Sequence, residues 1–415
     1  MLDIKILRDD IETIKDKLKI KGFNLDISLF KKLDAERKSL QISVEKLQAN
    51  KKDLSAKFGK AKATNEDVTN ISAEIDIVNS ELKEKEEKLN PILNELKEYL
   101  LHIPNIPDNS TPLGSNESDN LVIKKWGEIT NHEGLDHLQI SNDIDTELAS
   151  LLAGSRFSVL RGDIAKLHRA LIQFMLNEAA ANNYEEYYVP FITNKESLIG
   201  TGQLPKFEED LFKLTDDRYL ISTAEIPLTN LYRNKTINKS ELPIKVTAHT
   251  PCFRSEAGSY GKDTKGLIRQ HQFEKVELVQ IVDSNSSDQA LEELLGNAEN
   301  ILQKLNLPYQ VVQLCGGDLG FSAAKTYDIE VWLPSQQKYR EISSCSNFTD
   351  FQARRLNLKI SDTKTKYFAH TINGSGLAVG RTLIALIENY YDVNKKIISI
   401  PDILVPFTGF KTIKV

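Results

Sequence analysis

Apolar residues in the first hundred positions recur at sevens in two separate series. The first series is Leu33, Leu40, Leu47 and Leu54, and the second is Val68, Ile75, Leu82, Leu89 and Leu96. Heptad spacing places one apolar stripe along each helix, and two such stripes pack together as a coiled coil. The polar stretch KFGKAKATNED, which contains Gly59, separates the series and is expected to form the turn. The pattern therefore predicts an antiparallel helical hairpin over about residues 28–100.

The hydrophobic pattern changes after residue 103. Residues 104–120 contain three prolines and no apolar period, which is typical of a linker. Helical periodicity returns in DIAKLHRALIQFMLNEAAANN with Asp163 as the expected N-cap, and period-two segments dominate from residue 244 onward. Helices and strands in separate stretches favour an α+β domain with an antiparallel sheet. We therefore expect an N-terminal domain over 1–103, a linker over 104–120 and a second domain over 121–415.

Composition places the chain among ordinary globular proteins. Its 415 residues are 40% hydrophobic and 27% charged, and no apolar run approaches the length needed to span a bilayer. The first residues mix acids and bases without an apolar stretch, which argues against a targeting peptide. Cys252, Cys315 and Cys345 are too widely spaced for a cysteine-built zinc site, and their role stays open. We expect a cytoplasmic protein that binds no membrane and no zinc.

Charge is distributed unevenly along the predicted hairpin. Residues 31–62 hold ten basic and four acidic residues, and residues 66–104 hold four basic and ten acidic residues. One interpretation is that the two helices attract each other. The other is that the basic helix follows a phosphate backbone. The charges alone leave both interpretations open.

The densest chemical signal is FRSEAGSYGKDTKGLIRQHQFEKVEL, residues 253–278, which indicates two strands joined by a Gly-rich loop. Alternation would place several polar groups and one aromatic ring on shared faces: Arg254 with Glu256, and Arg269, His271, Phe273, Lys275 and Glu277 together. Guanidinium groups suit phosphates, an aromatic ring suits a base, and carboxylates suit amines. The alternatives are an exposed cross-strand ion-pair ladder and a phenylalanine in the core.

The spacing of residues in the sequence does not match other known nucleotide-binding or metal-binding motifs. GSYGKD is too short for a P-loop, NGSGLAVGR is one residue too long for the dinucleotide fingerprint, and the seven histidines form no HExxH pattern. Any ATP site is therefore of another kind. Two further stretches, STAEIPLTN and YREISSCSNFTDFQARR, carry polar groups that could be either functional or ordinary surface residues.

Taken together and in order, these segments resemble the bacterial-type seryl-tRNA synthetases, a family of class II aminoacyl-tRNA synthetases. The resemblance also covers PNIPD, GSRFSVLRGDIAKLHRAL and NGSGLAVGRTLIALIEN, so it extends from end to end. It implies a six- to seven-stranded antiparallel sheet flanked by helices, and a coiled-coil arm that grips serine tRNA. It also implies a homodimer with its interface over 163–192, which includes Pro190. The stretch SIPDILVPFTGF departs from the family pattern at Val405 and Phe407, which is expected to affect local packing.

The resemblance implies a role for individual residues. Arg254, Arg269 and Arg381 would be catalytic, with Arg254 between the ATP α-phosphate and the serine carboxylate and the other two on the γ-phosphate. Glu256 would bind the adenine amine and Phe273 would stack on adenine. Mg²⁺ would be held by Glu341 and Ser344. The remaining implied ATP contacts are Ser255, Ile342 and Ser343; the implied serine contacts are Thr223, Ala224, Glu225, Glu277 and Ser375; and the implied tRNA contacts are Lys38, Lys46 and Lys52.

The activity implied by the family is the ATP-dependent activation of L-serine and its transfer to the 3′ end of serine tRNA. Selenocysteine tRNA as a second substrate and the choice of isoacceptors stay open. Two other hypotheses are a tRNA- or partner-binding coiled-coil protein with a degenerate catalytic domain, and a ligase that loads a carrier protein. The intact Arg254, Glu256, Phe273 and Arg381 argue against the first hypothesis, and the long hairpin argues against the second.

Overall fold

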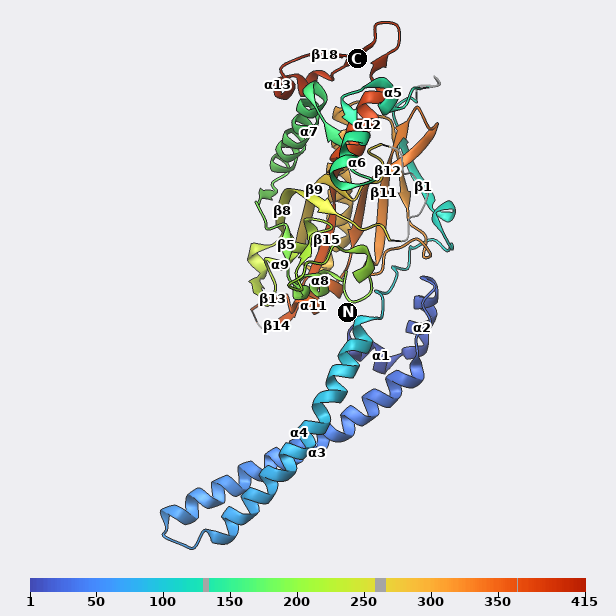
Figure 1. Ribbon diagram of the computed structural model, residues 1–415. Helices are drawn as coiled ribbons and strands as arrows, with labels where there is room; N and C mark the ends of the chain where they lie inside the picture. The colour runs from blue at the N-terminus through green and yellow to red at the C-terminus, as the bar shows by residue number, and fades with distance from the viewer. Residues whose placement is uncertain (130–133, 258–265, 364) are drawn as a thin grey trace. The chain divides into compact units, whose positions relative to one another are not determined.

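The computed structural model describes residues 1–129, 134–257, 266–363 and 365–415 (Figure 1). The chain forms two compact units. We call residues 4–15 and 23–103 the hairpin unit, and residues 1–3, 16–22 and 104–415 the sheet unit.

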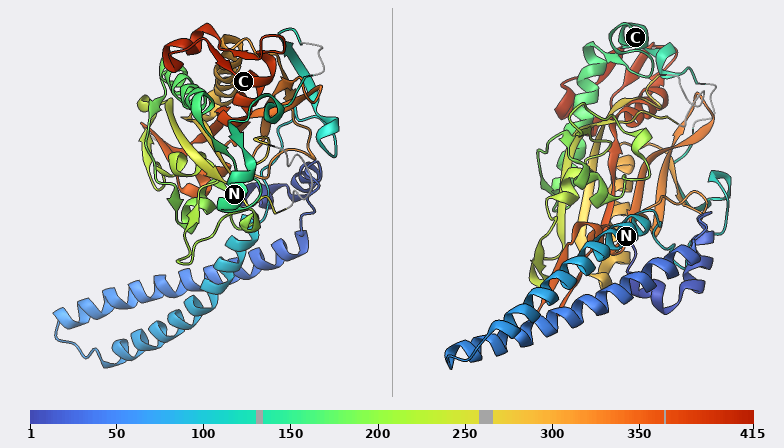
Figure 2. Two further views of the ribbon diagram at one scale, coloured as in Figure 1. Left: turned by 45° about the horizontal axis from the view of Figure 1, so that its top comes forward. Right: turned by 60° about the horizontal axis from the view of Figure 1, so that its bottom comes forward.

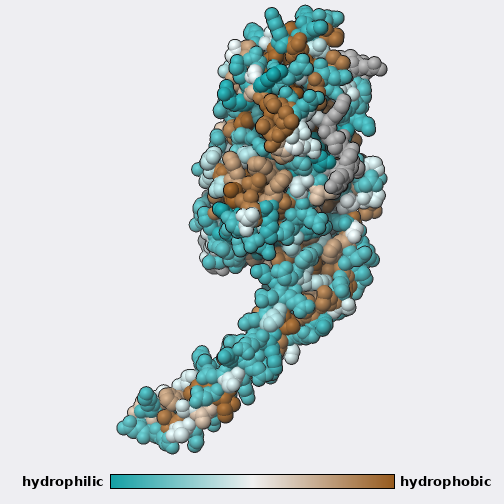
Figure 3. Space-filling model, viewed as in Figure 1, coloured by the Kyte–Doolittle hydropathy of each residue, from teal (hydrophilic) through white to brown (hydrophobic). Residues whose placement is uncertain are grey.

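Two long antiparallel helices, α3 (Ile27–Ala63) and α4 (Thr69–Leu101), make up most of the hairpin unit (Figure 1). Val44, Leu82 and Leu89 are buried between them, as the heptad spacing predicts. Hydrophilic residues cover much of their visible surface (Figure 3). The coiled-coil hairpin predicted from the sequence is therefore confirmed.

The turn of the hairpin differs from the expectation. Gly59 lies inside α3, and the chain reverses after Ala63 instead. The four extra helical residues bury Ala61, which is 7% exposed, and Asn65 then takes the left-handed conformation (φ +56°) that a tight reversal needs. Two short helices, α1 (Ile4–Asp9) and α2 (Ile11–Lys19), precede the hairpin, and α4 runs through Pro91 as one helix.

An eight-stranded sheet forms the centre of the sheet unit (Figure 1 and Figure 2). Its strands, in spatial order, are β1 (Leu121–Trp126), β10 (Tyr309–Gln313), β11 (Lys325–Leu333), β12 (Lys338–Asn347), β15 (His370–Ala378), β9 (Gln272–Val282), β8 (Ile244–Phe253) and β4 (Glu185–Glu186). Seven strands pair antiparallel, and β4 adds a two-residue parallel pairing with β8. The predicted α+β class and antiparallel sheet are confirmed, with this short extra strand.

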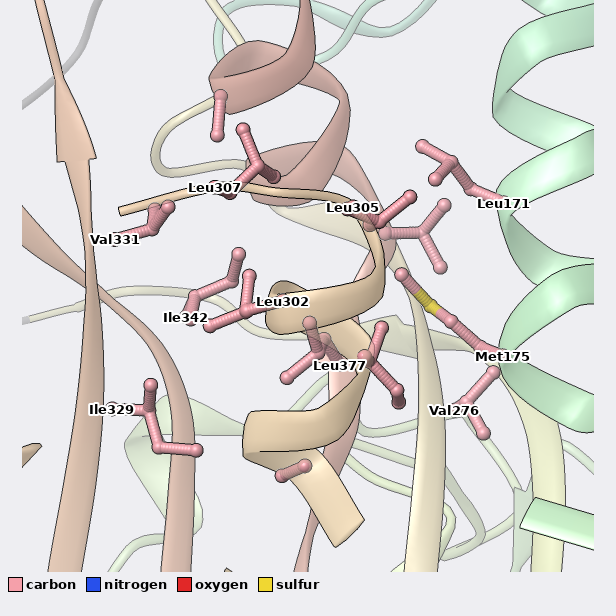
Figure 4. Close-up of a cluster of buried hydrophobic side chains, with 14 of the residues drawn as sticks. Leu171, Met175, Val276, Leu302, Leu305, Leu307, Ile329, Val331, Ile342 and Leu377 are labelled. Atoms are coloured by element: carbon pink, nitrogen blue, oxygen red, sulfur yellow. The ribbon is translucent and has the colours of Figure 1, made fainter. Parts of the chain in front are cut away.

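Helices α7 (Gly162–Ala181), α10 (Ser287–Lys304) and α12 (Val379–Asn389) contribute to the main core with the sheet. Figure 4 shows side chains of this core from several elements, including Met175, Leu302, Val331 and Leu377. Because strand residues alternate, even-numbered Val276 and Leu278 of β9 enter this core. The expected N-cap is corrected: α7 begins at Gly162, and Asp163 pairs with Lys166 at 2.9 Å in the first turn.

The opposite face of the sheet carries α9 (Glu225–Asn230) and α11 (Phe351–Leu356), and α8 (Lys195–Thr201) packs against these two helices. Odd-numbered Val279 of β9 packs there with Ala224 and Leu228. Glu277 therefore also faces this side.

The remaining short elements border these layers. They are α5 (His137–Ile140), β2 (Ile144–Asp145), α6 (Thr146–Ala153), β3 (Val159–Leu160), β5 (Ile192–Thr193), β6 (Tyr219–Leu220), β7 (Thr236–Asn238), β13 (Lys359–Asp362), β14 (Thr365–Phe368), β16 (Tyr391–Asp392), β17 (Ile397–Ser399), α13 (Val405–Thr408) and β18 (Thr412–Lys414). Phe407 of α13 contacts Phe174 of α7 edge to face, with ring centres 6.2 Å apart.

The proline-rich segment over 104–120 packs closely on the sheet unit. Asn105 is 4% exposed, and its Nδ2 donates to the carbonyl oxygen of Phe348 at 2.8 Å. Its backbone N–H donates to Phe321 O at 2.9 Å. In the part of the chain that the structure describes, no helix is both long and apolar enough to cross a membrane.

Candidate active site

A pocket of about 310 Å³ opens on the α9 side of the sheet. Most residues that the sequence marks as chemical candidates line it: Thr223, Glu225, Arg254, Glu256, Arg269, Phe273, Glu277, Glu341, Ile342, Ser344, Ser375 and Arg381. Segments that lie far apart in the chain therefore meet at one site.

Arg254 and Phe273 lie side by side at one end of β8 and β9. The pairing of Cys252 with Phe273 and the hydrogen bond from Arg254 N to His271 O (2.9 Å) fix the register at this point. The guanidinium carbon of Arg254 lies 5.2 Å from the centre of the Phe273 ring. The pair offers a fixed cation next to a flat apolar surface.

Glu256 and Arg269 line the pocket from outside the two strands, so strand alternation does not explain their positions. Strand β8 ends at Phe253 and β9 begins at Gln272, so both residues lie outside the strands. Glu256 has φ +52°, an uncommon conformation for a residue other than glycine, and its Oε2 lies 3.7 Å from Arg269 Nε. The loop residues 258–265 between them lie outside the described residues.

The expectation that His271 shares a face with Phe273 is wrong. His271 precedes β9, and its Nδ1 lies 2.9 Å from the carbonyl oxygen of Arg254. Its ring packs near Phe157 and Phe212 and does not line the pocket. Of the residues expected to share this face, Phe273, Lys275 and Glu277 lie on β9 and line the pocket.

Arg381 enters the pocket from the first turn of α12. Its Nε donates to Ile268 O at 3.1 Å, and its Nη1 donates to Glu341 O at 2.5 Å. The same Nη1 lies 3.4 Å from Glu341 Oε2. Enclosure in the pocket acts to raise the pKa of Glu341, but the charges of Arg381 and Arg254 outweigh it and hold the pKa below its ordinary value.

Glu341 and Ser344 both line the pocket although they are three residues apart on β12. A register shift between β11 and β12, beside Glu330, adds a residue to β12 and restores both to the same face. Their carboxylate and hydroxyl oxygens are donors that suit Mg²⁺. Within the described residues, no group of three or more His, Cys, Asp or Glu side chains is arranged to hold a metal ion.

The other end of the pocket is acidic and enclosed. Thr223 Oγ1 donates to Glu277 Oε2 at 2.7 Å, and Lys275 Nζ lies 2.5 Å from the same oxygen. Ser375 of β15 pairs directly with Glu277. Burial, followed by the charge of Glu277, raises the pKa of Glu225 to about 7.

Three residues implied by the family resemblance do not line the pocket: Ala224, Ser255 and Ser343. Ala224 is fully buried in the core beneath α9. Ser255 N donates to Asp210 O at 3.0 Å, and Ser343 Oγ donates to Ser375 O at 2.7 Å. Ile342 borders the pocket, while its side chain belongs to the main core (Figure 4).

Sequence reasoning missed three polar lining residues: Gln270, Ser346 and Asn373. Strand alternation predicts the correct face for Lys275 but assigns it no role. Asn373 and Ser346 lie two residues from Ser375 and Ser344, so strand alternation could have found them.

The candidate tRNA-binding lysines, Lys38, Lys46 and Lys52, are exposed on α3. Across the described residues of α3 and α4, no ion pair joins the two helices, and Gln48 Nε2 lies 3.5 Å from Glu86 Oε1. The opposite charges of the helices therefore face solvent.

Comparisons with known proteins give a consistent result. Residues 1–107 match the family model described as the seryl-tRNA synthetase N-terminal domain, and residues 206–390 match the tRNA synthetase class II core domain (G, H, P, S and T). Serine–tRNA ligase from Psychrobacter cryohalolentis is 51% identical over 99% of this chain and 98% of its own length. The one from Saccharophagus degradans is 53% identical over 100% and 99%. The structure of seryl-tRNA synthetase from Pyrococcus horikoshii complexed with ATP aligns with a TM-score of 0.90 and 34% identity, covering 100% of this chain and 99% of that chain.

Proposed function

The chain belongs to the seryl-tRNA synthetases, and from this premise we propose that its pocket holds ATP and serine in contact with each other. As a serine–tRNA ligase, it uses ATP to join serine to tRNA. The observation that carries the proposal is that one pocket combines three arginines and an aromatic ring with a buried acidic end.

ATP occupies the arginine-rich part of the pocket. Phe273 stacks on adenine and Glu256 accepts from its amine, while Arg269 and Arg381 bind the γ-phosphate. Ile342 borders the nucleotide, and Ser255 and Ser343 are the chain neighbours of the lining residues Arg254 and Ser344. The ATP complex of the Pyrococcus relative supports a nucleotide site in this fold.

Serine occupies the acidic end. Its ammonium group pairs with Glu225 beside Thr223 and Ala224, and its hydroxyl meets Glu277 and Ser375. Lys275 compensates the charge of Glu277, so two carboxylates can be present next to one ammonium group.

The first reaction step joins serine to AMP. A serine carboxylate oxygen attacks the α-phosphorus, the bond to the bridging oxygen breaks, and pyrophosphate leaves with that electron pair. Arg254, next to both substrates, neutralises charge that grows on the α-phosphoryl oxygens. Glu341 and Ser344 would hold Mg²⁺, which supplies further neutralisation of phosphate charge when bound.

The second step transfers serine to tRNA. A hydroxyl of the terminal ribose attacks the seryl carbonyl carbon, its proton is lost, and AMP leaves. Positioning and charge neutralisation account for most of the catalysis, because the pocket residues bind and orient groups rather than form covalent intermediates.

The hairpin unit binds serine tRNA through α3. Exposed Lys38, Lys46 and Lys52, with no ion pair to α4 among the described residues, support contact with tRNA phosphates. In this proposal, residues 1–103 form the tRNA-binding domain and residues 121–415 form the catalytic domain. Residues 104–120 link the two domains.

The active form is a homodimer that works in the cytoplasm, where charged tRNA is used. Tyr188 and Ile192, on either side of Pro190, are 90% and 41% exposed. Large apolar side chains at this exposure on a short segment support a partner surface over 163–192.

The experiment is aminoacylation of purified tRNA transcripts with labelled serine. Serine tRNA should be charged and other tRNA species should not. Failure to charge serine tRNA by the folded protein, with Mg²⁺ and ATP present, would refute the proposal.

A further inference from the structure

Gln352 lies directly behind the serine end of the pocket but does not line it. It is the second residue of α11, in the stretch FTDFQARR, and is 1% exposed. Its Nε2 donates to Glu225 Oε1 at 2.6 Å and to Thr201 O at 3.1 Å. A buried amide therefore binds the carboxylate that faces the substrate.

Two neighbours set which way this amide points, the carbonyl oxygen of Thr201 and the hydroxyl of Thr371 of β15. The hydroxyl of Thr371, which is also 1% exposed, donates to Gln352 Oε1 at 2.7 Å. A backbone carbonyl oxygen can only accept, so Thr201 requires the NH₂ group on its side, and the Thr371 hydroxyl then donates to the amide oxygen. All polar atoms of Gln352 then have partners, and a flipped amide would put an oxygen against a carboxylate.

We propose that Gln352, oriented by the Thr201 carbonyl and the Thr371 hydroxyl, is a positioning residue that keeps Glu225 ionised and aimed at the ammonium group of serine. This inference rests on the proposed role of Glu225. It assigns a function to a residue that touches neither substrate.

The charges around Glu225 explain why such a donor matters. From β9, Glu277 opposes ionisation of Glu225 and Lys275 favours it, and burial opposes it most strongly. From α11, α8 and β15, Gln352, the backbone of Thr201 and Asn373 face this region. The hydrogen bond from Gln352 lowers the pKa of Glu225, which nevertheless remains at about 7. The donor thus acts where a small change alters the charge at neutral pH.

The protonation state of Glu225 sets the direction of the pH dependence. A protonated Glu225 cannot pair with an ammonium group, so kcat/KM for serine should rise with pH through about 7 and level off above it. Without the Gln352 donor, the pKa of Glu225 is higher, so the rise should move to higher pH. A structural defect would instead lower the whole curve by one factor.

The test uses Gln352→Met, which keeps the length of the side chain and removes the donor. Serine-dependent ATP–pyrophosphate exchange is measured between about pH 6 and pH 8.5, with serine and ATP varied separately. Because hydrogen bonds to charged groups are among the stronger ones, KM for serine at pH 7 should rise by about ten- to a hundredfold. KM for ATP should stay within about twofold.

Gln280→Met is the matched control. Gln280 is also fully buried in the sheet, and its Nε2 donates to Tyr184 OH at 2.7 Å, on the face away from the pocket. This control should leave the serine pH profile in place. Thr371→Val should shift the profile in the same direction by less, and it carries the test if Gln352→Met does not fold.

The outcomes separate this inference from the proposed function. Wild-type exchange that does not depend on serine would overturn the proposed function itself. Serine-dependent wild-type exchange, with profiles of Gln352→Met and Thr371→Val that match that of Gln280→Met, would overturn only the positioning role. The positioning role is supported if the pH profile shifts in Gln352→Met and Thr371→Val and does not shift in Gln280→Met.

Discussion

Lys275 Nζ lies 2.5 Å from Glu277 Oε2, and the two side chains are 10% and 2% exposed. The same oxygen accepts the Thr223 hydroxyl. A buried carboxylate whose charge is compensated in this way can accept a further hydrogen bond from a substrate hydroxyl. Glu277 is thereby suited to distinguish serine from alanine.

Replacement of Glu277 by alanine should lower serine use and narrow the preference for serine over alanine. In sites that hydrogen-bond a substrate hydroxyl, kcat/KM for an analogue that lacks the hydroxyl is lower by a factor of roughly 10⁴ to 10⁵. The reason is that the analogue leaves buried polar groups of the site unpaired. The measurement is the ratio of kcat/KM for the two amino acids in exchange. A ratio as wide as that of the wild type would mean that Glu277 does not bind the hydroxyl.

Changing Lys38, Lys46 and Lys52 to glutamate should weaken tRNA binding and leave serine activation unaltered. The slope of log affinity against log salt should flatten by about one unit for each tRNA phosphate that the variant no longer neutralises. Changing the exposed Lys83, Lys88 and Lys97 of α4 to glutamate is the control, with an equal change in charge. Equal weakening of tRNA binding in both triple variants would exclude a specific phosphate role for α3.

Replacing residues 28–100 with a short flexible linker should leave serine activation intact and abolish most transfer to tRNA. The apolar residues of α3 and α4 are buried against each other, so removing both helices together leaves neither half of this core exposed. Circular dichroism checks folding, and exchange and aminoacylation are measured together. Loss of exchange in a folded variant would contradict this separation of roles.

The three cysteines should be unreactive in the native protein. All are buried, which keeps reagents away from the sulfur atoms. Burial also raises the pKa of Cys252 and raises that of Cys345 to about 12, so these two hold little thiolate at neutral pH. Titration with a thiol reagent should find no rapidly reacting group before denaturation and three after it. Rapid labelling of a native cysteine would show local opening near that residue.

Local patterns are sufficient to predict much of the fold. The heptads predict the hairpin because Leu33, Leu40 and Leu47 follow one helix, and alternation places Phe273 and Glu277 on one face. The bulge that brings Glu341 and Ser344 onto one face depends on the pairing of β12 with β11. No local sequence pattern predicts this pairing. The left-handed Glu256 and the contact of Gln352 with Glu225 likewise depend on distant segments.

The central claim is that the Arg254 pocket activates serine with ATP. Its most direct test is ATP–pyrophosphate exchange without tRNA, over all standard amino acids, for the wild type and Arg254→Ala. Serine alone should support exchange, and the variant should lose it mainly in turnover, because the Arg254 contact strengthens as charge develops on the α-phosphate. Exchange supported by another amino acid, or unchanged turnover in a folded Arg254→Ala variant, would contradict the account.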